Sequence, residues 1–314
     1  MTGSRNHEAG AMAMRRSAVL ALGAAMTAML ALAAPVRAAS PGTNGRIAFS
    51  ACGKNGCVVS TMLPNGTDVH HLTAGNAPDW SPDGQKIAFD DIRNGQPQVF
   101  TMNADGSDVQ QLTHLAGGAA DPSYSPDGSL LVFDHLPPSG CCGNIWSIRP
   151  DGTGLHQITH FTTENFPFQP EFSPDGQRIV FWEQSAHGGK FAAIFVMRAD
   201  GTDIRQVTPL RLDAAHPKWS PDGSKIIFNN DAHLNVGDIF TIRPDGTGLK
   251  RLTDVIPLGE ADFRPDFSPD GTMIVFDQLK GSQPISVWTM RSDGNNAKII
   301  KSNGVEPNWG PRRS

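Results

Sequence analysis

Six residues that each precede a proline occupy the same position of a sequence repeat, and four of them are of types that bind metal ions. The six positions hold Ala77, Asp121, Gln169, His216, Arg264 and Glu306. One histidine among carboxylate and amide oxygens favours the harder divalent cations, so this position predicts a Ca²⁺ or Mn²⁺ site. The candidate metal ligands are Asp121, Gln169, His216 and Glu306.

The positively charged member of this set, Arg264, is compatible with a different ligand. Its charge would repel a metal ion, unless it pairs with Glu306 or faces an anionic group of a substrate. A cation and Arg264 together would suit a uronate-bearing glycan, because they could share its carboxylate. The alternative is a polar, water-filled channel mouth without a bound ion. The candidate ligand-binding residues are Asp121, Gln169, His216, Arg264 and Glu306.

These positions belong to a unit that the chain repeats six times. Each unit carries an aromatic residue, followed in five copies by Ser-Pro-Asp-Gly, and successive aromatic residues are 42 to 48 residues apart. The aromatic residues are Trp80, Tyr124, Phe172, Trp219, Phe267 and Trp309. An Asp-Gly or Asn-Gly pair follows in every copy, and five copies contain an apolar residue followed by Thr. Pro, Asp and Gly favour tight turns, so each unit predicts short strands joined by hairpins.

Four antiparallel strands in a period of this length are typical of a β-propeller blade. The sequence therefore predicts an all-β, six-bladed propeller of four-stranded antiparallel blades. The segment around Trp309 supplies one strand of the blade whose other strands come from residues 46–73. We expect this pairing of the N- and C-terminal segments to close the ring and leave no long free edge.

The sequence pattern of the first 38 residues predicts a secretory signal peptide. Arg15 and Arg16 precede an apolar, Ala-rich run, and Val36-Arg37-Ala38 offers small residues around a cleavage site. A membrane anchor is the alternative, which Gly23 and Pro35 disfavour because they interrupt the run. The predicted organisation is a signal peptide (1–38), a short linker (39–43), the propeller (44–309) and a C-terminal tail (310–314).

The net charge expected after removal of the signal peptide disfavours one class of partner. The full sequence has 26 basic and 31 acidic residues, and removal of residues 1–38 leaves 22 and 30, a net charge of −8. A nucleic-acid partner is therefore disfavoured. After signal removal we expect no membrane span, a secreted or periplasmic location and a monomer.

Four cysteines, an even number, fit an oxidising compartment. Cys52 and Cys57 flank a predicted hairpin and can bridge it with ordinary geometry. Cys141 and Cys142 are adjacent, in a loop of a blade that does not neighbour the first. Either they form a strained vicinal disulfide or they are two thiols without a role.

The motifs resemble a known family. The run Trp-Ser-Pro-Asp-Gly-x-x-Ile-x-Phe at residues 80–89, with Ile-Phe-x-Met-Arg-x-Asp-Gly-Thr at 194–202, is similar to the PD40, WD40-like repeat of TolB-like six-bladed propellers. The resemblance covers residues 44–309. TolB carries an α/β domain before its propeller that binds partners of the Tol envelope system, and we expect that domain to be missing here. Related propellers precede serine peptidases, but this chain has no Gly-x-Ser-x-Gly motif.

Two functional hypotheses remain. In the first, an exported, non-enzymatic propeller binds a protein, peptide or glycan on the face that carries its longer, variable loops, such as residues 133–145 and 181–194. In the second, the chain is a metal-assisted polysaccharide lyase or hydrolase that acts at the channel mouth. Pectin-fragment lyases with a similar repeat place metal-binding His and Gln residues at comparable positions. We favour binding, because no acid/base pair or nucleophile stands out.

Overall fold

The described part of the chain folds into six four-stranded sheets, in each of which neighbouring strands are antiparallel. The computed structural model describes residues 42–312 except 94, 141, 163–164, 186–191, 231–236 and 255–259. They belong to one compact unit, Arg37–Ser314. The predicted signal peptide, residues 1–38, lies outside the described residues, as do residues 39–41 of the predicted linker.

The blades follow one another along the chain, and only blade 1 combines both ends. Blade 1 consists of β24 (Val305–Pro311), β1 (Asn44–Gly53), β2 (Gly56–Met62) and β3 (His70–Ala74). Blade 2 is β4 (Asn76–Trp80), β5 (Lys86–Arg93), β6 (Gln96–Asn103) and β7 (Gln110–Gln111). Blade 3 is β8 (Ala119–Tyr124), β9 (Leu131–His135), β10 (Asn144–Ile148) and β11 (His156–Gln157).

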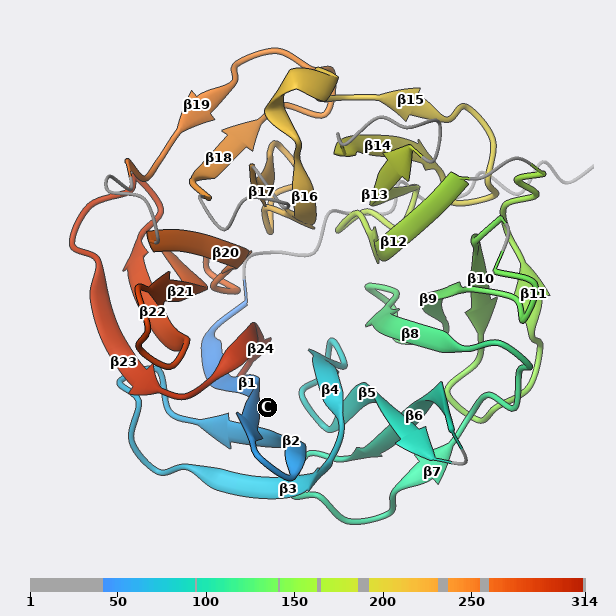
Figure 1. The fold of residues 1–314 in the computed structure, drawn as a ribbon, viewed down its shortest axis with the longest axis horizontal. Helices are drawn as coiled ribbons and strands as arrows, with labels where there is room; N and C mark the ends of the chain where they lie inside the picture. The colour runs from blue at the N-terminus through green and yellow to red at the C-terminus, as the bar shows by residue number, and fades with distance from the viewer. Residues whose placement is uncertain are drawn as a thin grey trace, which may run out of the picture. The chain divides into compact units, whose positions relative to one another are not determined.

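The remaining three blades repeat this order. Blade 4 is β12 (Asn165–Phe172), β13 (Arg178–Ser185), β14 (Ala192–Arg198) and β15 (Arg205–Gln206). Blade 5 is β16 (Ala215–Trp219), β17 (Ile226–Asn229), β18 (Ile239–Ile242) and β19 (Lys250–Arg251), preceded by a 3₁₀ turn at Leu210–Leu212. Blade 6 is β20 (Glu260–Phe267), β21 (Met273–Lys280), β22 (Ser286–Arg291) and β23 (Lys298–Ser302). Figure 1 shows the first strand of each blade nearest the common centre.

The six-bladed propeller and its closure are confirmed. β24 pairs antiparallel with β1, with Trp309 opposite Ile47 and Val305 opposite Ser50. β24 continues to Pro311, past the expected end at Trp309, because Pro311 still pairs with Asn44. No helix in residues 42–312, as far as they are described, is long and apolar enough to cross a membrane.

Each repeated motif has a structural role. In the first turn of blade 2, the N–H of Gly84 donates to the Ser81 carbonyl, and the Ser81 hydroxyl donates to Asp83. Gly84 has a φ of 67°, a backbone conformation that glycine adopts readily. The motif near the end of the unit is an apolar residue followed by Thr. In blade 2 the hydroxyl of this Thr, Thr113, accepts the backbone N–H of Val99 in the third strand at 2.9 Å. The motifs therefore fix the turns and the outermost strand of a blade.

The core lies between neighbouring blades. Trp80, Ile87 and Phe89 of blade 2 pack with Ala48 and Val59 of blade 1 in one buried cluster. Equivalent clusters join the other blades. Since each sheet buries side chains against both neighbours, the closed ring holds the six first strands at the centre.

Candidate functional site

The six pre-proline residues line one central cavity, as the repeat predicted. We call them the pre-proline ring: Ala77, Asp121, Gln169, His216, Arg264 and Glu306. The residues two positions further along each first strand line the same cavity and are called the deep ring: Asp79, Ser123, Glu171, Lys218, Asp266 and Asn308. The space not filled by atoms is about 530 Å³, part of it open to solvent.

The cavity opens on the face with the longer connections. From the pre-proline ring, each first strand runs towards a Ser-Pro-Asp-Gly turn or its equivalent, so the short turns lie at the opposite face. The second strand returns to the ring, where Asn76 pairs with Asp90 in blade 2. The hairpin that Cys52 and Cys57 close lies on this same face. The ring is therefore the channel mouth that the variable loops surround.

All six residues of the pre-proline ring have left-handed backbone conformations. Their φ values lie between 46° and 55°, and the first strand of each blade has a register shift beside this residue. A β-bulge redirects a side chain, and a non-glycine residue in this conformation costs about 1–3 kcal/mol. Ala77, whose side chain is a methyl group, shares the conformation. The bulge is therefore a property of the blade, whatever side chain it presents to the channel.

A second set of residues, which the repeat did not predict, contacts the pre-proline ring from blades 1, 3, 4, 5 and 6. We call it the partner ring: Ser50, Asp90, Asp134, Trp182, Asn229 and Asp277, each directly after the phenylalanine of a second strand. Their contacts to the pre-proline ring are Ser50 Oγ to Glu306, Trp182 Nε1 to Gln169 and Arg264 Nη1 to Asp277, each at 3.0 Å, and His216 Nδ1 to Asn229 at 2.9 Å. The recurring Phe-Ser, Phe-Asp and Phe-Asn pairs in the sequence are the signal that could have identified this ring.

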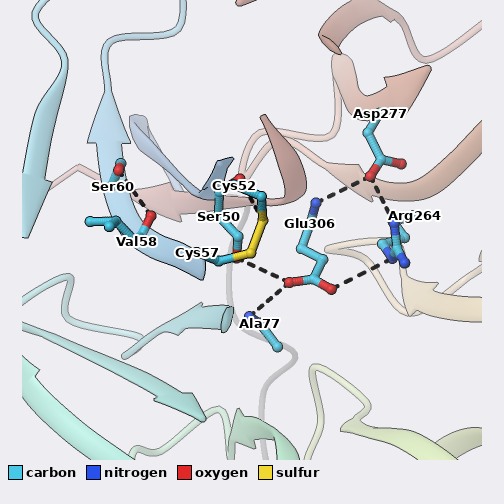
Figure 2. The surroundings of a disulfide bond; sticks show 9 residues. All are labelled: Ser50, Cys52, Cys57, Val58, Ser60, Ala77, Arg264, Asp277 and Glu306. Carbon is cyan, nitrogen blue, oxygen red and sulfur yellow. Dashed lines mark hydrogen bonds and ion pairs between the residues drawn. A yellow bond between two sulfur atoms is a disulfide. The ribbon is translucent and has the colours of Figure 1, made fainter. Parts of the chain in front are cut away.

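Arg264, Asp277 and Glu306 form one hydrogen-bonded group beside the Cys52–Cys57 disulfide (Figure 2). Arg264 Nε lies 3.9 Å from Glu306 Oε1, and the Glu306 N–H donates to Asp277 at 3.2 Å. Burial raises the pKa of Asp277 to about 6, although the guanidinium of Arg264 opposes the shift. By the expectation from the sequence, a cation can bind near Arg264 if Arg264 pairs with Glu306, and the two side chains do pair. The side chain of Arg264 is 31% exposed.

His216 is neutral in this environment. Burial and the charge of Arg264 lower the pKa of His216 to about 3, while its hydrogen bond with Asn229 opposes the shift. Asn229 Oδ1 also accepts the N–H of Arg264, so His216 Nδ1 is the donor and Nε2 carries the free lone pair. The His216 ring packs 5.8 Å from that of Trp182, which packs 4.7 Å from Phe168. This side of the mouth is aromatic and uncharged.

The deep ring joins neighbouring blades. Asp79, Glu171, Asp266 and Asn308 accept the backbone N–H of the aromatic residue in the next blade, at 2.8 to 3.0 Å. Burial raises the pKa of Glu171 to about 8, and the nearby ammonium of Lys218 opposes that shift. Lys218 Nζ lies 3.7 Å from Asp79 and 3.9 Å from Glu171. The charged side chains of the deep ring therefore contact backbone N–H groups or one another.

The four predicted metal ligands lie around the same cavity, but metal binding stays a prediction. Gln169 Nε2 lies 3.5 Å from Asp121 Oδ1, whereas Gln169 Oε1 accepts from Trp182 and Glu306 Oε2 accepts from Ser50 and Ala77. In the part of the chain that the structure describes, no three His, Cys, Asp or Glu side chains are grouped closely enough to hold a metal ion. A metal would therefore have to compete with hydrogen bonds already made.

The cysteine prediction is confirmed for one pair. Cys52 and Cys57 form a disulfide across the β1–β2 hairpin. Cys142 is disulfide-bonded, and Cys141 lies outside the described residues, so the vicinal pairing stays a prediction. A disulfide is typical of proteins in oxidising compartments.

Comparisons with known proteins identify relatives of this chain. The family model described as the TolB beta propeller domain, PD40, matches residues 61–159 and 139–313. The protein Atu1656 of Agrobacterium fabrum is 29% identical over 179 residues, which are 53% of this chain and 60% of that protein. A TolB homolog of Chlorobium luteolum is 30% identical over 171 residues, which are 54% of this chain and 37% of that protein.

A solved structure shares the fold. The structure of TolB from Acinetobacter baumannii superposes with a TM-score of 0.71 at 20% identity, covering 85% of this chain and 67% of that one. The two sequence relatives are longer than the matched region: the match covers 60% of the length of Atu1656 and 37% of the length of the TolB homolog, less than two thirds of each. Since the family model matches most of the sequence, the chain belongs to the PD40 family of TolB β-propeller domains.

Proposed function

We propose that this chain is an exported, non-enzymatic propeller that binds a protein or peptide at the channel mouth. The observation that carries the proposal is the composition of the pre-proline ring. One cavity combines the partly buried guanidinium of Arg264, which pairs with Asp277 and Glu306, a carboxylate at Asp121 and the free Nε2 lone pair of His216. A peptide offers the matching partners, since its main chain donates and accepts hydrogen bonds and its side chains carry both charges.

Export is the second part of the proposal. The basic and apolar N-terminal segment predicts a signal peptide, and the Cys52–Cys57 disulfide fits an oxidising compartment. A mature chain secreted by its host should begin near residue 39, which N-terminal sequencing or intact mass measures.

The binding face can be tested with two matched positions in blade 3. Leu136, in the loop after β9, is 39% exposed on the mouth face, and Leu155, in the turn before β11, is 43% exposed on the opposite face. A peptide selected from a random display library on the immobilised mature chain should form a covalent adduct with a photo-reactive residue at Leu136. The same peptide should not react with that residue at Leu155.

Two outcomes would overturn the proposal. Reaction at Leu155 alone would place the ligand on the face of the short turns. Enrichment of no peptide, together with enrichment of acidic oligosaccharides on the same immobilised chain, would favour a glycan ligand. If the chain also forms a new double bond in those oligosaccharides, which its ultraviolet absorbance would measure, the lyase alternative would be supported.

A further inference from the structure

A second groove lies between blades 1 and 2, on the face of the short turns. We call it the seam groove, and its lining includes Leu63, Pro64, Leu72, Trp80, Pro311 and Arg312. The space not filled by atoms is about 1310 Å³, part of it open to solvent. None of the residues that line the seam groove lines the central cavity, so this groove is separate from the channel mouth.

Leu63 is an apolar side chain at a repeat position that is polar in the other five blades. The position lies two residues before the Asp or Asn of the second turn. The other blades hold Asn103, Arg149, Arg198, Arg243 and Arg291 there. The Leu63 N–H donates to the Thr67 carbonyl at 2.9 Å, and Asn103 makes the equivalent hydrogen bond in blade 2, so the turn does not require leucine. The Leu63 side chain is 37% exposed and lines the groove.

In three other seams, the residue equivalent to Trp80 packs with a side chain of the preceding blade. That side chain comes six positions after the aromatic residue of its own blade, and it joins the same buried cluster or stacks on the ring. These pairs are Leu130 with Phe172, Arg178 with Trp219 and Met273 with Trp309. Two of the three partners are apolar, so the fold itself shows which kind of side chain packs on this aromatic position.

The corresponding residue of blade 1 is bound within its own blade. Arg46 donates to the Thr61 hydroxyl at 3.1 Å and to the Asp68 carboxylate at 2.6 Å. Trp80 lines the seam groove together with Leu63. An apolar side chain of another molecule would therefore bury its surface here as the partner side chains do in the other seams.

The seam groove also offers a positive charge. Arg312 is exposed, and its side chain makes no hydrogen bond or ion pair with the part of the chain that the structure describes. Arg46 and His70, which also line the groove, both contact Asp68, at 2.6 and 2.8 Å. Asp105, an acidic lining residue, accepts hydrogen bonds from its own turn. An anionic group of a ligand would therefore pair with Arg312.

We propose that the seam groove binds an acidic peptide segment of a partner protein, with a methionine or leucine side chain on Trp80 and an adjacent carboxylate paired with Arg312. Methionine suits this groove because its flexible side chain fills irregular gaps and its sulfur makes favourable contacts with aromatic rings. The inference goes beyond binding at the channel mouth, because the seam groove lies on the opposite face and takes a second segment.

The first test uses the peptide acetyl-Gly-Met-Glu-amide as the probe and the indole N–H signal of Trp80, in a two-dimensional NMR spectrum of the mature chain, as the readout. Trp80→Phe assigns the signal and should fold, because Phe172 and Phe267 hold the equivalent position. The Trp80 signal should shift to a plateau as the peptide is added. Acetyl-Gly-Ser-Glu-amide should bind about tenfold weaker or worse, because it buries no apolar side chain. Acetyl-Gly-Met-Gln-amide should bind about threefold weaker, because an exposed ion pair contributes little.

Two variants separate the apolar contact from the charge. Leu63→Asn introduces the residue type that blade 2 holds at this position, and it should weaken binding of acetyl-Gly-Met-Glu-amide about fivefold or more. Leu155→Asn is the matched control, since Leu155 is 43% exposed on the same face in blade 3, and it should bind as the wild type does. Arg312→Gln should weaken binding of this peptide about threefold and leave binding of acetyl-Gly-Met-Gln-amide unchanged.

Three results would overturn the inference. They are a Trp80 signal that does not shift to a plateau, equal affinities for acetyl-Gly-Met-Glu-amide and acetyl-Gly-Ser-Glu-amide, or wild-type affinity in Leu63→Asn. Equal effects of Arg312→Gln on the two methionine peptides would contradict the ion pair. A wild-type dimer in sedimentation that Leu63→Asn dissociates would assign the groove to a second copy of the chain instead of a partner peptide. The adduct at Leu136 reports on the other face, so failure here leaves the binding function of the mouth standing.

Discussion

The carboxylate of Glu306 accepts the backbone N–H of Ala77 at 2.9 Å, although 229 positions separate the two residues in the chain. The contact links the last strand of the propeller, β24, to the first strand of blade 2. The same Glu306 oxygen accepts the Ser50 hydroxyl at 3.0 Å. One carboxylate thus connects the closing strand to its own blade and to the next, at the channel mouth.

Closure by β24 predicts the effect of a C-terminal deletion. Removal of residues 305–314 takes away Glu306, Trp309 and the pairing with β1, and it exposes the edge of β1 to association with other chains. The shortened chain should melt at a markedly lower temperature or precipitate. A substitution at the exposed Lys298 of β23, Lys298→Ala, is the control and should melt close to the wild type. An unchanged melting temperature after the deletion would show that β24 does not close the ring.

The Cys52–Cys57 disulfide should contribute modestly to stability. It closes a short loop, with a sequence separation of 5, so the chain-entropy model gives about 2 kcal/mol. The double variant Cys52→Ala, Cys57→Ala should lower the free energy of unfolding by about this amount in a denaturant titration. Peptide mass mapping without reductant should recover the bridge, and free thiols at both positions in the exported protein would contradict the oxidised state.

His216 should make the fold sensitive to acid. Its pKa is lowered to about 3 in the folded chain by burial and by Arg264, whereas the unfolded chain titrates near 6.5. The unfolded state therefore binds more protons between these values, so the contribution of His216 to stability falls as the pH drops from about 6.5 towards 3, by up to about 1.4 kcal/mol per pH unit. His216→Gln should reduce this acid slope of the unfolding free energy. Equal slopes in the two proteins would show that His216 is accessible to protons in the fold.

The metal site that the sequence predicts can be tested on the purified chain. If Asp121, Gln169, His216 and Glu306 hold Ca²⁺ or Mn²⁺, elemental analysis should find the ion in the wild type. His216→Ala should remove the ion, while the melting temperature of the metal-free protein stays nearly the same. A wild-type protein with no cation above background would contradict the metal site and leave the binding function in place.

The sequence predicted the architecture because the repeat marks local events. Pro, Asp and Gly at fixed places specify turns, and their spacing specifies strand length, so six blades follow from six copies of Trp80 and its equivalents. Symmetry also predicted correctly that Asp121, Gln169 and their equivalents surround one cavity. The turns, the strand lengths and the position of the pre-proline residue are properties of a single blade, so six copies of the motif are enough to predict them.

The contacts of the partner ring could not be predicted in the same way. Strand alternation indicates the sheet face on which Asp90 or Asp277 lies, but their contacts depend on the bulge beside each pre-proline residue. Nothing in the repeat signals that residues such as Ala77 adopt a positive φ. The contacts between the two rings became visible only when the equivalent positions of the blades could be compared in three dimensions.

The affinity of a selected peptide for a chain with a narrowed mouth tests the proposed binding site most directly. Ala77→Leu adds bulk beside Asp90 and Asp121 without changing the charge, whereas Leu155→Ala changes the opposite face. Calorimetry should show binding about tenfold weaker or worse for Ala77→Leu, because the added side chain takes space that the ligand needs, and unchanged binding for Leu155→Ala. Equal affinities of the wild type and Ala77→Leu would contradict binding at the channel mouth.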